Sequence, residues 1–181
     1  IARMEPAATR SSSLDSGTAR PLQGRIDSRG PTSSSRFILF LASGAGLGYA
    51  PFASGTFGSL LGIVLYLALL QVTTSVVPTL VLLAIATVIA IAVAGRADAI
   101  WQEHDSGKIV IDEIVGMAIA LVGFEPTWTN VIVIFLIFRV LDVVKLWPAN
   151  YCDREMPGGA GVVLDDVVSG IYANLVARVF L

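Results

Sequence analysis

Five acidic residues in the second half of the chain stand at the edges of apolar stretches and could act together chemically. They are Asp112, Glu113, Asp142, Asp165 and Asp166. Carboxylates without histidine or cysteine partners suit a hard cation such as Mg²⁺, which prefers oxygen ligands. A cation held in this way can polarise a phosphoryl group and orient or activate water. We therefore predict that all five are catalytic, and that Glu113, Asp142, Asp165 and Asp166 are metal ligands.

Two basic residues flank the middle acid. Arg139, Asp142 and Lys145 follow one another at intervals of three residues, so they share one face of a helix. A ladder of ion pairs would explain this spacing. A phosphate site would explain it too, with the arginine binding through its fork and the lysine as a point charge. The two explanations are compatible, and we expect Arg139 and Lys145 to bind a substrate phosphate.

A glycine-rich segment lies upstream of the acids, where residues 44–58 read GAGLGYAPFASGTFG. In a membrane protein, such irregular backbone is tolerated where it lines a polar cavity or an interface. Backbone N–H groups near a helix start also favour anions. Close helix packing through small residues is the ordinary alternative. We predict that the hydroxyls of Thr56 and Ser59 help to bind the phosphate.

The elements that must position these residues are apolar helices. Of the 181 residues, 55% are hydrophobic and 14% are charged, against roughly 25% charged in soluble proteins. No charged residue occurs from Phe37 to Ala94, and one membrane span takes about 20 residues. We expect an all-α fold, a polytopic membrane bundle of about four to five apolar helices, with the glycine-rich segment before the first.

Five apolar runs are the expected helices. They cover residues 59–72, 76–94, 114–124, 128–141 and 162–181. The third and fourth runs are short for full spans. To reach the length of a span, each run must include the charged residues at the end away from the turn between them. Otherwise the run is partly re-entrant.

If these runs alternate in direction, all five acids reach the same membrane face. Arg96, which ends the second run, marks that face as cytoplasmic because basic residues favour the cytoplasmic side. Any single acid could be an ordinary helix cap. Ionisable groups at a membrane boundary are costly and usually have partners or a function, so acids on three helices favour a shared site.

The first 36 residues differ from the rest of the chain. They contain six arginines and three acidic residues among many serines, and they lack the apolar periodicity that folding requires. We expect residues 1–36 to be a disordered tail and residues 37–181 to be the membrane-embedded domain. No basic patch interleaved with aromatic residues occurs, so a nucleic-acid partner is not expected.

Four sequence blocks carry a resemblance to a known family. They are GLGYAP at 46–51 with GTFGS at 55–59; DEIVG at 112–116; Phe138 and Arg139 with Asp142, Lys145, Trp147 and Pro148; and Gly158, Gly159 and Gly161 with Asp165, Asp166 and Gly170. In these blocks, and in their order over about residues 37–181, the chain resembles bacterial phosphatidylglycerophosphatase A. It departs from the family pattern at Ser54, Leu141, Leu146 and Ser169, and none of these changes removes a charge.

The resemblance implies a substrate and a location. A member of this family removes the terminal phosphate of phosphatidylglycerophosphate to give phosphatidylglycerol, and it depends on Mg²⁺. The resemblance also implies a multi-pass protein of the bacterial inner membrane, surrounded by membrane lipid, with the active site facing the cytoplasm. The acidic motif residues of the family fall on the same five acids. Leu146 replaces a proline beside Lys145, which leaves the placement of that lysine in doubt.

Two other phosphatase mechanisms lack their residues. Gly158 stands six residues after Cys152, where a cysteine phosphatase would need arginine, and His104 is the single histidine. Direct attack by metal-activated water is our preferred mechanism, and a covalent aspartyl-phosphate stays open. His104 could act as a general acid or a peripheral ligand, although a lone histidine in a loop is more often a solvated bystander.

Two other functions use clustered acids in a membrane. A cation transporter or channel needs polar groups through the middle of the bilayer, whereas the second apolar run has none. A CDP-alcohol-type phosphotransferase needs a longer signature of several aspartates, which we do not find. The sequence leaves the oligomeric state open, with a homodimer as one option.

Overall fold

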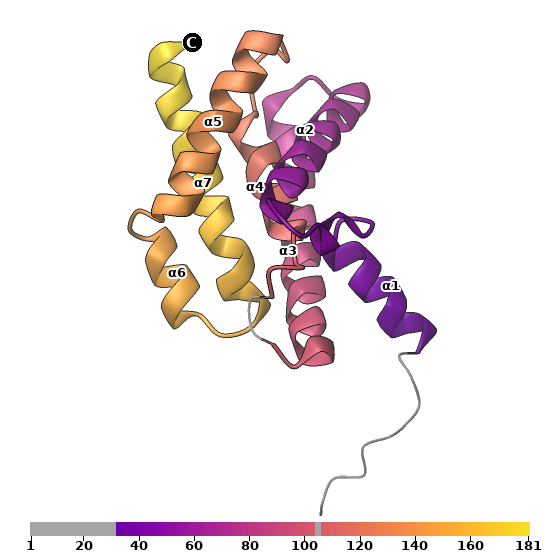
Figure 1. The fold of residues 1–181 in the computed structure, drawn as a ribbon. Coiled ribbons are helices and arrows are strands. Elements are labelled where there is room, and N and C mark those ends of the chain that lie inside the picture. Colours follow the sequence, from indigo (N-terminus) through magenta and orange to yellow (C-terminus); the bar gives the residue numbers. More distant parts are fainter. Residues whose placement is uncertain (1–31, 104–105) are drawn as a thin grey trace, which may run out of the picture. The chain divides into compact units, whose positions relative to one another are not determined.

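The computed structural model describes residues 32–103 and 106–181, and the regular structure in these residues is entirely helical. The helices are α1 (Ser33–Ala42), the 3₁₀ helix η1 (Leu47–Tyr49), α2 (Ser54–Val72), α3 (Val76–Trp101), α4 (Ile111–Ala120), α5 (Trp128–Val144), α6 (Ala149–Glu155) and α7 (Gly159–Phe180). Figure 1 shows their arrangement, with α5 and α7 side by side and α6 below them. The predicted all-α membrane bundle is confirmed.

The helices differ in how much of a bilayer they can cross. Three of them, α2, α3 and α7, are long and apolar enough to span it. The helix α5 has 17 residues, at the lower limit for a span. The helix α4 has 10 residues and is therefore about 15 Å long, half of a hydrocarbon core of about 30 Å. Its length fits the partly re-entrant alternative.

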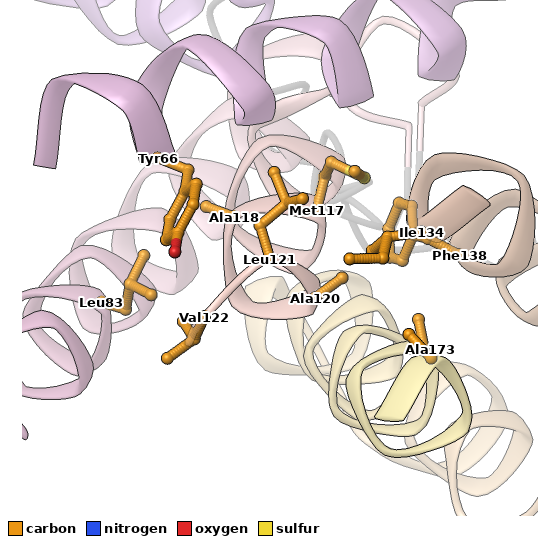
Figure 2. Packing of buried hydrophobic residues seen from close by; sticks show 11 residues of the cluster. Tyr66, Leu83, Met117, Ala118, Ala120, Leu121, Val122, Ile134, Phe138 and Ala173 are labelled. Carbon is orange, nitrogen blue, oxygen red and sulfur yellow. The ribbon is translucent and has the colours of Figure 1, made fainter. Parts of the chain in front are cut away.

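The short helix α4 is the centre of the bundle, because it packs against α2, α3, α5 and α7. Figure 2 shows its buried side chains, including Met117 and Leu121, between Tyr66 of α2 and Phe138 of α5. These side chains are almost completely buried. The apolar side chains on the outer surfaces of the long helices, such as Val88, remain exposed, as expected of residues that face lipid.

A glycine stripe brings α2 into backbone contact with α4. A Cβ atom on Gly62 would lie 2.6 Å from the carbonyl oxygen of Ile114, and one on Gly58 would lie 3.0 Å from that of Val110. A Cβ atom on Gly55 would overlap a carboxylate oxygen of Glu113. Small residues allow such close approach. The predicted packing role of the glycine-rich segment is therefore present, and its last part is helical rather than irregular.

The helices α4 and α7 cross in the same way. A Cβ atom on Gly116 would lie 2.7 Å from the carbonyl oxygen of Asp166, and one on Gly170 would overlap the carbonyl oxygen of Gly116. No side chain larger than hydrogen fits at either position. This crossing places the second turn of α4, at Gly116, directly beside the segment of α7 from Asp166 to Gly170.

Side chains from α2 and α7 satisfy the backbone where α4 ends inside the bundle. Asn174 donates through Nδ2 to the carbonyl oxygens of Ala120 at 2.9 Å and Val122 at 2.8 Å, and the Tyr66 hydroxyl donates to that of Phe124 at 2.9 Å. Arg178 donates to the Val122 carbonyl at 3.1 Å. Carbonyl groups at a helix end lack intrahelical donors, so these bonds allow α4 to stop short of the membrane surface.

Several predicted boundaries differ from the structure. The helix α2 begins at Ser54, before the predicted residue 59, and α3 continues to Trp101, beyond the predicted residue 94. The helix α3 continues through Gly95 because that glycine packs against the start of α7 at Gly159. Two helices were not predicted. The helix α6 follows the turn after α5, and α1 begins at Ser33, inside the predicted tail, whose residues 1–31 lie outside the described part.

Candidate active site

Three helices bring four of the predicted acids to one end of the bundle. Asp112 and Glu113 lie in the first turn of α4, and Asp142 lies in the last turn of α5. Asp166 lies two turns inside α7, because that helix begins at Gly159 rather than at the predicted residue 162. Asp112 is 8% exposed and Asp166 is 3% exposed. The acids therefore form a largely buried cluster and are not solvated helix caps.

The cluster has the donor set of a site for a hard cation. Asp112, Glu113 and Asp166 each offer one carboxylate oxygen, and these oxygens lie within 4.8 Å of one another. The side chain of Glu113 is in hydrogen-bond contact with Asp112, and that of Asp166 with Asp142. Within the described residues, Glu113 Oε2 is buried without a hydrogen-bond partner. Buried like charges repel each other, and a cation among them would remove this repulsion.

Arg139 supplies the positive charge nearest to this cluster. Its Nη1 lies 2.7 Å from Asp142 Oδ2 and 3.5 Å from Ser59 Oγ. Ser59 is completely buried and donates to the carbonyl oxygen of Gly55 at 2.9 Å. The structure therefore brings the predicted Arg139 and Ser59 together near the start of α2. Thr56 lies in the first turn of that helix and is half-buried, and the roles of Thr56 and Ser59 remain predictions.

Lys145, the second basic residue predicted to bind phosphate, is held by two ion pairs, and its role remains a prediction. It ends α5 in the left-handed conformation, with φ at 47°. Its Nζ lies 2.6 Å from Asp153 Oδ1 and 2.7 Å from Asp165 Oδ2. Burial lowers the pKa of Lys145, but these two carboxylates outweigh burial and raise it above its usual value. The lysine is thus a charged bridge between α6 and α7.

Asp165 is not one of the three grouped carboxylates, although it lies close enough to Asp112 for their charges to interact. One of its oxygens pairs with Lys145, and the other is buried with no hydrogen-bond partner in the described part of the chain. Asp153 was missed at the sequence level because it lies on a different helix from Lys145, so no helical spacing relates them. The neighbouring Cys152 is half-buried, and burial, together with the charge of Asp165, raises the pKa of its thiol. The predicted His104 lies outside the described residues.

The comparisons with known proteins agree on one family. The family profile described as phosphatidylglycerophosphatase A matches residues 40–181. The chain belongs to the phosphatidylglycerophosphatase A family. All four helices that carry the candidate site residues, α2, α4, α5 and α7, lie within the matched range, as does α6 with Asp153. No solved structure matches the chain.

Curated relatives in three bacteria are similar over most of their length. The phosphatidylglycerophosphatase A of Escherichia coli (strain K12) is 37% identical over 134 residues, which cover 74% of this chain and 77% of the relative. The protein of that name in Haemophilus influenzae is 35% identical over 140 residues, which cover 77% of this chain and 85% of the relative. A protein of Bacteroides thetaiotaomicron bears a name that proposes it as a phosphatidylinositol-3-phosphatase. It is 34% identical over 148 residues, which cover 78% of this chain and 91% of the relative.

Proposed function

We propose that this protein is a phosphatidylglycerophosphatase, which hydrolyses the terminal phosphate monoester of phosphatidylglycerophosphate to give phosphatidylglycerol and phosphate. The observation that carries this proposal is the buried cluster of Asp112, Glu113 and Asp166 beside Arg139, in a membrane protein of this family. The two alternatives, a cation transporter and a CDP-alcohol-type phosphotransferase, have no support from the family or from its relatives.

The donor set supports Mg²⁺ as the ion. Asp112, Glu113 and Asp166 would hold it, with Asp142 close by, and the buried Glu113 Oε2 without a partner fits this role. When bound there, Mg²⁺ supplies a Lewis acid that polarises the phosphoryl oxygens and activates water. Asp165, which the sequence suggested as a ligand, instead orients Lys145 in our proposal.

The protein's own groups bind and orient the phosphate. Arg139 can donate to two phosphate oxygens through its fork, and it lies close to the start of α2. There the N–H groups of Ser54 and Gly55 lie in the first helical turn, where backbone donors lack intrahelical acceptors and favour anions. The pairing of Arg139 with Asp142 leaves Asp142 oriented and able to accept the proton of an attacking water.

The reaction that follows is a direct displacement. Water attacks the phosphorus atom and gives a proton to Asp142, the bond from phosphorus to the glycerol oxygen breaks, and that oxygen takes up the proton that Asp142 accepted. A covalent aspartyl-phosphate on one of the acids is the alternative, and it would appear as phosphate bound to denatured protein. We place the site on the cytoplasmic side of a bacterial inner membrane because Arg96 and Lys145 lie toward that end.

The deciding experiment measures phosphate release from phosphatidylglycerophosphate by the detergent-solubilised full chain. We expect release that requires Mg²⁺ and stops with a chelator. Asp166→Asn should reduce the rate by about a hundredfold or more, the usual loss when a group that stabilises the transition state is removed. Glu125→Gln is the matched control, since Glu125 lies in the turn at the opposite end of the bundle, and it should retain the wild-type rate.

Each negative result has a separate meaning. A wild-type protein that releases phosphate from no lipid phosphomonoester would disprove the proposed function. Release that is unaffected by Asp166→Asn would disprove the site assignment alone. Faster release from phosphatidylinositol-3-phosphate than from phosphatidylglycerophosphate would move the substrate to the one named for the relative in Bacteroides thetaiotaomicron.

A further inference from the structure

Two apolar cavities meet on the surface between α5 and α7. One has a volume of about 480 Å³ and reaches Trp147 and Tyr172, and the other has a volume of about 350 Å³ and reaches Leu136. Leu141 of α5 and Val176 of α7 line both cavities. The two are therefore parts of one groove, which we call the α5–α7 groove.

The direction of the α5–α7 groove matches that of a lipid chain. The helix α5 runs toward the acid cluster, so Trp147 lies at the acid end of the groove and Leu136 lies farther along it, away from the acids. The rise from Leu136 to Leu141 alone is about 7.5 Å. A groove that starts at the level of the acids and continues toward the bilayer centre follows the path of an acyl chain below its headgroup.

The residues that line the acid end of the groove are neighbours of the candidate site residues in the sequence. Leu141 immediately precedes Asp142, and Leu146 immediately follows Lys145. The ion pair of Lys145 with Asp165 of α7 lies at this end of the groove, and the nearby Arg139 supplies a guanidinium that can bind an anionic headgroup. A lipid with its phosphate at the acids would therefore have its chains at the mouth of the groove.

One hydrogen bond fixes the acid end of the groove. The Tyr172 hydroxyl of α7 donates to the carbonyl oxygen of Trp147 at 2.9 Å, and the Trp147 side chain is 74% exposed. Tryptophan and tyrosine favour the membrane–water interface. This pair therefore marks the level at which a bound lipid changes from headgroup to hydrocarbon.

We propose that the α5–α7 groove binds an acyl chain of the phospholipid substrate while the phosphate of the same molecule lies at the acid cluster. This inference rests on the proposed function and adds the route by which the substrate reaches the site, laterally from the bilayer between α5 and α7. A second apolar pocket, of about 200 Å³, lies by α3 and is lined by Leu80 and Arg178. It is at the opposite end from the acids and provides a control.

The test fills the groove and compares two chain lengths. Val176→Trp and Val140→Trp place a large side chain in the groove from α7 and from α5, at positions that are 38% and 61% exposed. The substrates are dioleoyl and dihexanoyl phosphatidylglycerophosphate, presented to the detergent-solubilised full chain. Only the longer chains reach the deep part of the groove. Leu80→Trp adds the same side chain to the pocket by α3.

We expect both groove variants to lower kcat/KM for the dioleoyl substrate by about tenfold, the loss that follows if about two methylene groups leave the groove. The dihexanoyl substrate should change by less than about twofold, and Leu80→Trp should alter neither. Equal losses on the two substrates, or no loss on either, would overturn the groove proposal. Absence of phosphate release by the wild type would instead reject the proposed function.

Discussion

Lys145 joins two helices beside the acid cluster through ion pairs. It contacts Asp153 of α6 at 2.6 Å and Asp165 of α7 at 2.7 Å. Both carboxylates raise the pKa of Lys145. The stabilisation from the two ion pairs is therefore fully present below the ordinary lysine pKa of about 10.4. It is lost only as the pH rises through the raised pKa of Lys145 in the folded protein. Lys145 therefore stays charged throughout the neutral range.

Asp153→Ala tests this bridge. With one partner removed, Lys145 is held by Asp165 alone, and we expect kcat to fall by about tenfold while KM changes less. Stability should fall by about 1 kcal/mol or less, because the ion pair is part-exposed. Asp153→Glu should restore most of kcat, and Glu155→Gln on the same helix should have no effect. A rise in KM with unchanged kcat would instead indicate that Lys145 binds the phosphate directly.

The composition of the site was predictable from residue types, but its pairings were not. The five acids stood out because each lay at the edge of an apolar run, and the structure brings Asp112, Glu113, Asp142 and Asp166 together. Asp165 separates from them because its side chain meets Lys145. That contact depends on how α6 folds back against α7, and no spacing within one helix encodes it.

At the scale of the helices, glycines set the distances between the carboxylates. Gly116 allows the backbones of α4 and α7 to touch at Asp166, and this contact brings Asp112 and Glu113 beside Asp166. The positions of α2 and α3 followed from uncharged apolar runs, and that of α7 from an apolar run that includes Asp165 and Asp166. The helices α1 and α6 were missed because α1 begins in a run of serines and α6 is a seven-residue, mostly polar segment, so neither shows the apolar periodicity that indicates a helix. Thr32, which caps α1 by accepting from the Ser35 N–H, was the available signal.

Gly116→Ala tests the crossing of α4 and α7. The added methyl group would meet the Asp166 carbonyl at 2.7 Å, so the helices must move apart. We expect a loss of about 1–3 kcal/mol in stability, as for other overpacked sites, and a larger loss of activity than of stability. Gly107→Ala is the matched control, because a Cβ atom there has no heavy atom within 4 Å. Equal melting temperatures and activities for both variants would contradict the close crossing.

At the scale of the whole molecule, the acid cluster should make stability depend on the metal. An ion that binds only the folded state stabilises it by about 2.7 kcal/mol at 100 times its Kd, which corresponds to roughly 5–10 °C in Tm. We expect Mg²⁺ to raise the Tm of the detergent-solubilised protein, and Asp166→Asn to abolish this rise. In chelator the variant should melt no lower than the wild type, since it removes one of the repelling charges. A rise of equal size in both proteins would place the ion elsewhere.

The position of Cys152 has a practical consequence. It is the single cysteine of the chain, and it lies in α6 beside Asp153, the residue that ties that helix to Lys145. The chain therefore already carries a unique attachment point for a thiol-reactive fluorophore or spin label, which should react best above neutral pH because burial raises the pKa of its thiol. A label there would report any separation of α6 from the bundle during turnover, with no other cysteine to remove first.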